Sequence, residues 1–258
     1  MIVELDTISS TMDYARELLR SHTLQIDKSG MLSHQAVICK YQTSGRGQRG
    51  REWVSMDGDN LYSTLFYQGI PLTGQSAGHV SLIAGAAVAE AVYLAFMESH
   101  WPNNISNMAS IGIKWPNDIL LNGKKAGGIL IEIENDSQVG PVALIGTGIN
   151  IGTSKLSPEL TSSATSFLLE NMKPVPPIRL LQWILHALDR LTYIYKIAGL
   201  SGIVRRWRHW DATTGMKFTC NTSEGWIGTA VGLDDNGHLI LRKEDGSQFS
   251  VLGATHLI

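Results

Sequence analysis

Short apolar runs and stretches of helical spacing follow one another along the chain without regular alternation. Helices are predicted over residues 10–19, 76–98 and 178–198, and the first begins at a Ser10–Asp13 pair that resembles a capping box. Strands are predicted over residues 36–41, 60–67, 111–114, 119–122, 128–133 and 142–147. This order of elements favours an α+β fold with a mixed sheet over a doubly wound parallel sheet.

The pattern changes near Ala212. From Met216 onward, short apolar runs alternate with turn sequences such as Asp234-Asp235-Asn236-Gly237. Strands are expected there over residues 217–221, 226–231, 239–242, 248–251 and 256–258. The sequence therefore predicts a larger domain over residues 1–211 and a small all-β domain over residues 212–258.

Several features limit the class of protein. The apolar segment Val80–Met97 has Glu90 near its middle, where a carboxylate would be costly in lipid, so we expect a buried helix and no membrane partner. Lys and Arg number 21 against 23 Asp and Glu, which argues against general nucleic-acid binding. The N-terminus lacks the apolar run of a signal peptide. Cys39 and Cys220 have no metal-ligand spacing, which favours reduced thiols in a cytoplasmic protein.

The most informative motif is the segment Gly45–Trp53, with the sequence GRGQRGREW. Its glycines allow backbone N–H groups to close on an anion, and its arginines bring forked positive charge to phosphate or carboxylate. The spacing imitates a dinucleotide fingerprint, but that fingerprint requires a helix directly after the glycines, and the next regular element expected here is a strand. The segment, called the arginine loop below, predicts a site for an anionic, nucleotide-like ligand in an enzyme.

Three further motifs contain candidate site residues. In Lys114–Asp118 (KWPND), polar groups end a strand, although an Asx turn would look the same. In Lys124–Gly128 (KKAGG), Lys125 lies nearer the glycines and is the better candidate to present an ammonium group to a pocket. In Gly146–Asn150 (GTGIN), the glycines allow a ligand to approach the backbone, although a bulged strand end is an alternative.

Taken together and in this order, the four motifs resemble those of the biotin protein ligases, and the likeness covers nearly the whole chain. The resemblance implies a mixed α+β catalytic domain followed by a small SH3-like barrel. It implies activation of biotin by MgATP to biotinyl-5′-adenylate, and transfer of biotin to a lysine of a biotin carboxyl carrier protein, such as that of acetyl-CoA carboxylase. Many bacterial members also have an N-terminal DNA-binding module. We expect a form without it, with no DNA partner and with a homodimer as a possibility.

The resemblance also implies roles for individual residues. It assigns the ureido group of biotin to Ser10, Thr11 and Gln42, and catalysis at the biotin carboxylate and the reacting phosphate to Lys125 and Arg46. The other biotin contacts that it implies are Met12, Gly45, Gly47, Gln48 and Gly128. The ATP contacts that it implies are Arg46, Arg49, Arg51, Trp53, Lys114, Asn117, Asp118 and Asn150, with Asp118 also near Mg²⁺.

The chain departs from the family pattern at two positions. Met12 stands where many members have asparagine, which removes a polar partner from the biotin site. Gln48 stands where many have an arginine that helps to retain the adenylate. The nearest alternative is a lipoate or octanoate ligase, which shares the fold but needs a long apolar tunnel. A second is a non-catalytic biotin sensor or transcription factor, which would require a DNA-binding module and a basic face.

Overall fold

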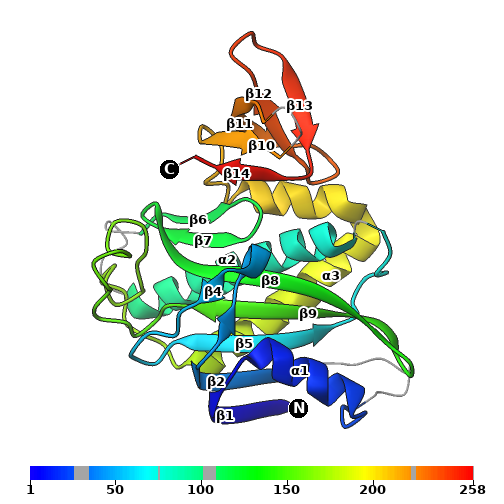
Figure 1. Cartoon of the computed structure of the whole chain (residues 1–258), viewed down its shortest axis with the longest axis vertical. Coiled ribbons are helices and arrows are strands. Elements are labelled where there is room, and N and C mark those ends of the chain that lie inside the picture. The colour runs from blue at the N-terminus through cyan, green and yellow to red at the C-terminus, as the bar shows by residue number, and fades with distance from the viewer. Residues whose placement is uncertain (26–34, 75, 101–108, 222–224, 258) are drawn as a thin grey trace.

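The computed structural model describes residues 1–25, 35–74, 76–100, 109–221 and 225–257. A seven-stranded mixed sheet forms the larger part of the molecule, and a five-stranded antiparallel sheet follows it (Figure 1). The strands of the larger sheet are β1 (Ile2–Ile8), β2 (Ala36–Gln42), β5 (Leu61–Tyr67), β6 (Ile111–Lys114), β7 (Asp118–Leu121), β8 (Lys124–Asp136) and β9 (Gly140–Ile149). The helices are α1 (Thr11–Arg20), α2 (Ser76–His100) and α3 (Pro177–Arg208).

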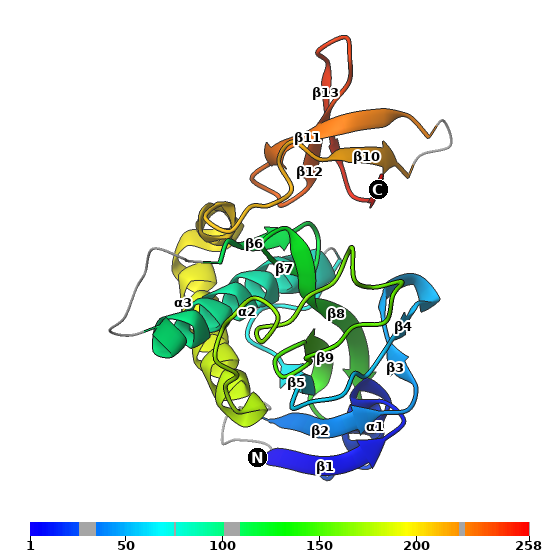
Figure 2. The same cartoon turned by 90° about the vertical axis from the view of Figure 1, so that its left-hand side faces the viewer.

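The strands of the larger sheet lie in the order β1-β2-β5-β9-β8-β7-β6. Only β1 and β2 run parallel, and the other neighbours are antiparallel. Helices α2 and α3 cover one face of the sheet, and α1 lies on the other (Figures 1 and 2). This architecture confirms the α+β class with a mixed sheet.

The arginine loop forms a small hairpin of its own. It consists of β3 (Gly45–Arg46), a turn of 3₁₀ helix over Gln48–Gly50, and β4 (Glu52–Trp53). The elements directly after the glycines are the strands β4 and β5 (Leu61–Tyr67) and not an α-helix, so the rejection of a dinucleotide fingerprint is confirmed.

Helix α2 lies in the core between the sheet and α3. Most apolar side chains along it, from Val80 to Phe96, are almost fully buried, although Leu94 is exposed. The helix is long and apolar enough to span a membrane, yet 78% of its most apolar window is buried inside the protein. Glu90 forms an ion pair with Arg190 of α3, which compensates its charge. The expectation of a core helix is therefore confirmed.

The C-terminal sheet has the order β13-β12-β11-β10-β14. Its strands are β10 (Lys217–Cys220), β11 (Ile227–Leu233), β12 (Leu239–Arg242), β13 (Gln248–Val251) and β14 (Ala254–His256). The predicted boundary after residue 211 falls in the connection between α3 and β10. Buried residues of both sheets nevertheless belong to one continuous core, so the division into two domains stays a prediction.

Several elements differ from the sequence-based expectation: β3 and β4 were not predicted, β8 is longer than the predicted strand, and β14 covers Ala254–His256 where residues 256–258 were expected. Strand β1 was not predicted, because it lies at the sheet edge and its polar residues Glu4 and Asp6 interrupt the apolar pattern. Helix α3 continues to Arg208, ten residues beyond the predicted end. Gly199, with φ of 63°, breaks the helical geometry within it, and this break explains why the sequence pattern appeared to stop there.

Candidate active site

One cavity of about 500 Å³ lies across the larger sheet and contains most of the predicted site residues. Because its lining residues follow the strand order from β2 to β6, the cavity runs from the N-terminus of α1 to the C-terminal sheet. The predicted residues that line it are Ser10, Thr11, Met12, Gln42, Arg46, Gly47, Gln48, Arg49, Arg51, Trp53, Lys114, Asn117, Asp118, Lys125 and Gly128. Four motifs that are distant in the sequence therefore form one site.

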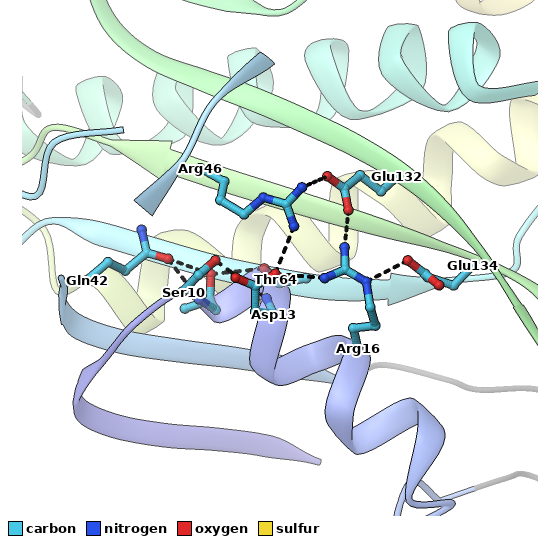
Figure 3. Close-up of polar contacts among 9 residues, drawn as sticks. Ser10, Asp13, Arg16, Gln42, Arg46, Thr64, Glu132 and Glu134 are labelled. Atoms are coloured by element: carbon cyan, nitrogen blue, oxygen red, sulfur yellow. Dashed lines mark hydrogen bonds and ion pairs between the residues drawn. The ribbon is translucent and has the colours of Figure 1, made fainter. Parts of the chain in front are cut away.

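The end of the cavity near α1 is lined by hydroxyl and amide groups. Ser10 caps α1, its hydroxyl accepting from the Asp13 N–H at 3.5 Å. The Gln42 side-chain carbonyl accepts from the backbone N–H of Thr11 at 2.8 Å and from its hydroxyl at 3.1 Å, and Thr64 donates to that hydroxyl at 3.0 Å (Figure 3). These groups are buried, so each exchanges hydrogen bonds with defined partners. Ser63 and Thr147, joined at 2.8 Å, extend the hydroxyl lining.

Beside this end, Met12 supplies an apolar wall. Its side chain is buried, and a Cβ at Gly146 would lie only 2.9 Å from its terminal methyl group. The absence of a side chain at Gly146 therefore gives Met12 its space. Leu130 and Ile129 of β8 continue the apolar lining.

In the middle of the cavity, the indole of Trp53 lies against two glycines. Gly128 of β8 and Gly148 of β9 are paired across the sheet. A Cβ would lie 3.1 Å from the ring at Gly128 and 2.5 Å from it at Gly148. The Lys125 ammonium lies 5.5 Å from the ring centroid, within reach of a cation–π interaction. The close approach of Trp53 thus requires glycine at position 148 and leaves little room for a side chain at position 128.

Near the C-terminal sheet, the cavity is strongly charged. Asp118 lies between two lysines, with its oxygens 2.8 Å from Lys114 Nζ and 2.6 Å from Lys125 Nζ. Burial by itself would raise the pKa of Asp118, but the two ammonium groups outweigh it and lower that pKa below its usual value. The carboxylate therefore stays ionised and holds both lysines in place.

Arg46 lies in an ionic cluster that sequence reasoning did not find. Its guanidinium donates to Asp13 at 2.8 Å and to Glu132 at 2.9 Å (Figure 3). Arg16 contacts the same two carboxylates and also Glu134 at 2.7 Å. The two arginines hold the pKa of Asp13 below its usual range although partial burial opposes this. In this arrangement protein carboxylates surround the Arg46 guanidinium, so its role toward an anionic ligand stays a prediction.

Two predicted residues do not line the cavity. Gly45 lies in β3, where a Cβ would be 2.4 Å from the Trp53 carbonyl oxygen, so its glycine serves the hairpin. Asn150 is buried behind the cavity, and its side-chain amide donates to the Thr165 carbonyl at 3.0 Å. Asn117 does line it, but its amide also has a structural partner, the Ile129 carbonyl at 2.7 Å. The motifs therefore predicted where these residues lie along the chain, but not which partners their side chains contact.

The residues present do not fit a magnesium site held by the protein alone. Both oxygens of Asp118 already contact lysines. Over the described residues, no group of three or more His, Cys, Asp or Glu side chains is arranged to hold a metal ion. The magnesium role expected for Asp118 therefore lacks geometric support.

The C-terminal sheet also contributes to the cavity, which the sequence did not predict. Phe218, Ala254, Thr255 and His256 line its charged end. The His256 ring packs on Phe218 with centroids 5.3 Å apart. Burial, together with the Lys114 ammonium, lowers the pKa of His256 and favours the neutral imidazole. No motif signalled these residues, because only the contact between the two sheets brings them to the site.

The fold and cavity define an α+β protein with one site that has hydroxyl and amide groups at one end and two lysines at the other. Residues 5–150 match the model of the biotin/lipoate A/B protein ligase family, and the chain belongs to that family. It is 31% identical to the bifunctional ligase/repressor BirA of Bacillus spizizenii, over 95% of this chain and 70% of that protein. It is 31% identical to the biotin–[acetyl-CoA-carboxylase] ligase of Paracoccus denitrificans, over 85% of this chain and 88% of that protein.

The structure resembles that of a solved relative with a bound reaction intermediate. The biotin protein ligase of Leishmania major, in complex with biotinyl-5-AMP, superposes with a TM-score of 0.64 at 27% identity. The match covers 100% of this chain and 98% of that one. The fold is therefore that of the biotin protein ligases.

Proposed function

We propose that this chain is a biotin–protein ligase that forms biotinyl-5′-adenylate from biotin and ATP and then transfers biotin to a carrier lysine. The observation that carries the proposal is the order of chemical groups along one cavity. Hydroxyl and amide groups around Thr11 and Gln42 suit a ureido ring, and Met12, Leu130 and Trp53 suit the sulfur ring and its aliphatic chain. The lysines around Asp118 suit a carboxylate meeting a phosphate.

In the first step, a biotin carboxylate oxygen would attack the α-phosphorus of ATP, and the bond from that phosphorus to the leaving pyrophosphate would break. Two anionic groups repel each other, so the step requires positive charge at the point of attack. Lys125 provides it from β8, and Asp118 and Trp53 fix its position. ATP would arrive as its Mg²⁺ complex, in which the metal neutralises phosphate charge, and we assign no protein ligand to that metal.

In the second step, the amine of the carrier lysine would attack the carbonyl carbon of the mixed anhydride. AMP would leave, and the amine would lose a proton. A mixed anhydride is sensitive to water, so the arginine loop, whose residues line the cavity, would have to exclude solvent. The acceptor class is a biotin carboxyl carrier domain, such as that of acetyl-CoA carboxylase. We place the reaction in the cytoplasm, in keeping with two buried free thiols, of which Cys39 has its pKa raised to about 11 by burial.

The test is calorimetric titration of the protein with biotin and, separately, with lipoate, followed by ATP-dependent labelling of a biotin carboxyl carrier domain. We expect tight binding of biotin, weak binding of lipoate and labelling of one carrier lysine. Preference for lipoate would instead indicate the lipoate ligase branch of the family. Binding of biotin without pyrophosphate release would indicate a sensor.

A further inference from the structure

Arg49 extends from the arginine loop to the C-terminal sheet. Its guanidinium donates to the Thr255 hydroxyl at 3.0 Å and to the Ala254 carbonyl at 3.3 Å. Both acceptors belong to β14, the strand of the C-terminal sheet that lies nearest the larger sheet (Figure 1). The Thr255 hydroxyl in turn donates to Asn221 at 3.0 Å, so it is held in position to accept.

The backbone of Arg49 supports the importance of this contact. Arg49 has φ of 59°, in the left-handed region that favours glycine, although Gly50 stands next to it with φ of 73°. An unfavourable backbone conformation persists where surrounding contacts hold it. The hydrogen bonds to β14 are such contacts, and they are made by the side chain of that same residue.

Arg49 also stands between two cavities. The second cavity, of about 260 Å³, lies between the start of α2 and the C-terminal sheet, with His79, Leu82 and Leu252 in its lining. Gln48, Arg49, Trp115 and Pro116 line both cavities. The contact of Arg49 with β14 therefore lies where one cavity would otherwise continue into the other.

We propose that β14 is the docking strand of the arginine loop, and that Thr255 and the Ala254 carbonyl are positioning groups that hold Arg49 and keep the loop closed over the first cavity. The part that concerns the adenylate rests on the proposed function. Arg49 was expected to contact ATP directly, whereas here its guanidinium is committed to the C-terminal sheet. The C-terminal sheet then acts in catalysis by retaining the intermediate, without supplying a reacting group.

The first test is Thr255→Val, a substitution of the same shape that keeps strand propensity and removes the hydroxyl, both as the acceptor for Arg49 and as the donor to Asn221. Hydrogen exchange is followed at the amides of residues 45–53 in the ligand-free protein. We expect exchange there to be roughly three- to tenfold faster, because one hydrogen bond to a charged group is lost. Thr255→Ser keeps the hydroxyl and should show the slow exchange of the unaltered chain. Thr219→Val is the matched control, because Thr219 is paired with Thr255 on β10 and lies outside the lining of both cavities.

The second test measures free biotinyl-adenylate released without a carrier, and the KM for ATP. Thr255→Val should release adenylate several-fold faster than the unaltered chain, with an equal or higher KM for ATP and an unchanged melting temperature. Unaltered loop exchange would overturn the docking role. A lower KM for ATP would also overturn it, because Arg49 would then be a direct ATP contact that β14 competes for. Absence of adenylate from the unaltered chain would refute the proposed function, while the exchange comparison would still decide the docking role.

Discussion

At the scale of single residues, the site is organised by the carboxylate of Asp118. It lies between Lys114 and Lys125, and their positive charge lowers its pKa despite burial. The carboxylate thus has two effects: it keeps the lysines in the cavity, and it reduces their repulsion before an anionic substrate enters. The two lysines differ in what else they contact, because Lys125 alone also lies over Trp53.

Replacement of Lys125 by alanine should nearly abolish adenylate formation. The positive charge would be lost where a carboxylate and a phosphate meet, and loss of such a group slows the chemical step by about 10²–10³-fold. Pyrophosphate release with biotin and ATP measures the effect. Lys124→Ala is the matched control, since the Lys124 ammonium donates to the Thr161 carbonyl at 3.4 Å, away from Asp118, and this variant should retain near-normal release. Near-normal release by Lys125→Ala would remove this residue from catalysis.

Replacement of Asp118 by asparagine should lower stability in a pH-dependent way. The pKa of Asp118 is depressed in the folded state, so its ionised form contributes stability above the unfolded value of 3.8. That contribution is lost as the pH falls through the lower folded value. Near pH 7 the free energy of unfolding of the variant should be about 1–3 kcal/mol lower than that of the unaltered chain, because two lysines lose their carboxylate partner.

Urea unfolding of both proteins across the acid range checks the sign of this effect. The difference between them should stay constant from about pH 7 to pH 5 and shrink below the unfolded value. A difference that grows on acidification would mean that burial, and not the lysines, dominates the pKa of Asp118.

At the scale of elements, two paired glycines give the strands β8 and β9 a flat area without side chains. Gly128 and Gly148 are cross-strand partners, and the Trp53 ring of β4 lies on both. Since β4 ends the arginine loop, this stacking attaches one end of the loop to the sheet, while Arg49 attaches its middle to β14. The loop is therefore fixed at two points.

Gly148→Ala should displace Trp53 and weaken biotin binding more than Gly128→Ala does. The added methyl would lie 2.5 Å from the ring at position 148, which requires the ring to move, against 3.1 Å at position 128, where a small shift is enough. Overpacking of this kind costs about 1–3 kcal/mol, which is roughly 5- to 150-fold in Kd. Titration calorimetry with biotin compares the two variants, and equal affinities would show that the ring does not need this flat area.

The elements also show what sequence patterns could and could not predict. The four motifs lie at strand ends and in turns, where glycine and proline leave clear signals, so their positions and most of their cavity contacts were predicted. Strand β1 was missed, because an edge strand with polar residues lacks the pattern. The pairing of Arg46 with Glu132 was missed too, because it joins residues 86 positions apart whose charges give no local signal.

At the scale of the whole molecule, the two sheets share one core. The Trp115 N–H donates to the Thr213 hydroxyl at 2.7 Å, and the Trp115 indole donates to the Gly237 carbonyl at 3.3 Å. The Leu82 side chain of α2 packs against Gly237 so closely that a Cβ there would lie 2.3 Å away. Contacts between the sheets therefore position a site motif, which explains why Thr255 and His256 could not be assigned to the cavity from sequence alone.

If the core is continuous, the chain should unfold in a single transition, and a substitution at the junction should destabilise both sheets together. Thr213→Val is the sharpest such change. Thr213 is only 1% exposed, and its hydroxyl accepts from the Trp115 N–H and donates to the Ile113 carbonyl at 3.3 Å. Valine would leave the buried Trp115 N–H without an acceptor, at a cost of about 1–3 kcal/mol in the free energy of unfolding.

Urea unfolding followed by tryptophan fluorescence and by circular dichroism should give coincident curves for both proteins, shifted to lower urea in Thr213→Val. Thr214→Val is the matched control, because this neighbouring threonine is exposed and its change should stay within about 0.5 kcal/mol. Two separate transitions, with only one shifted by Thr213→Val, would mean that the C-terminal sheet is an independent folding unit. In that case the C-terminal sheet would influence the arginine loop only through the contacts of β14 with Arg49.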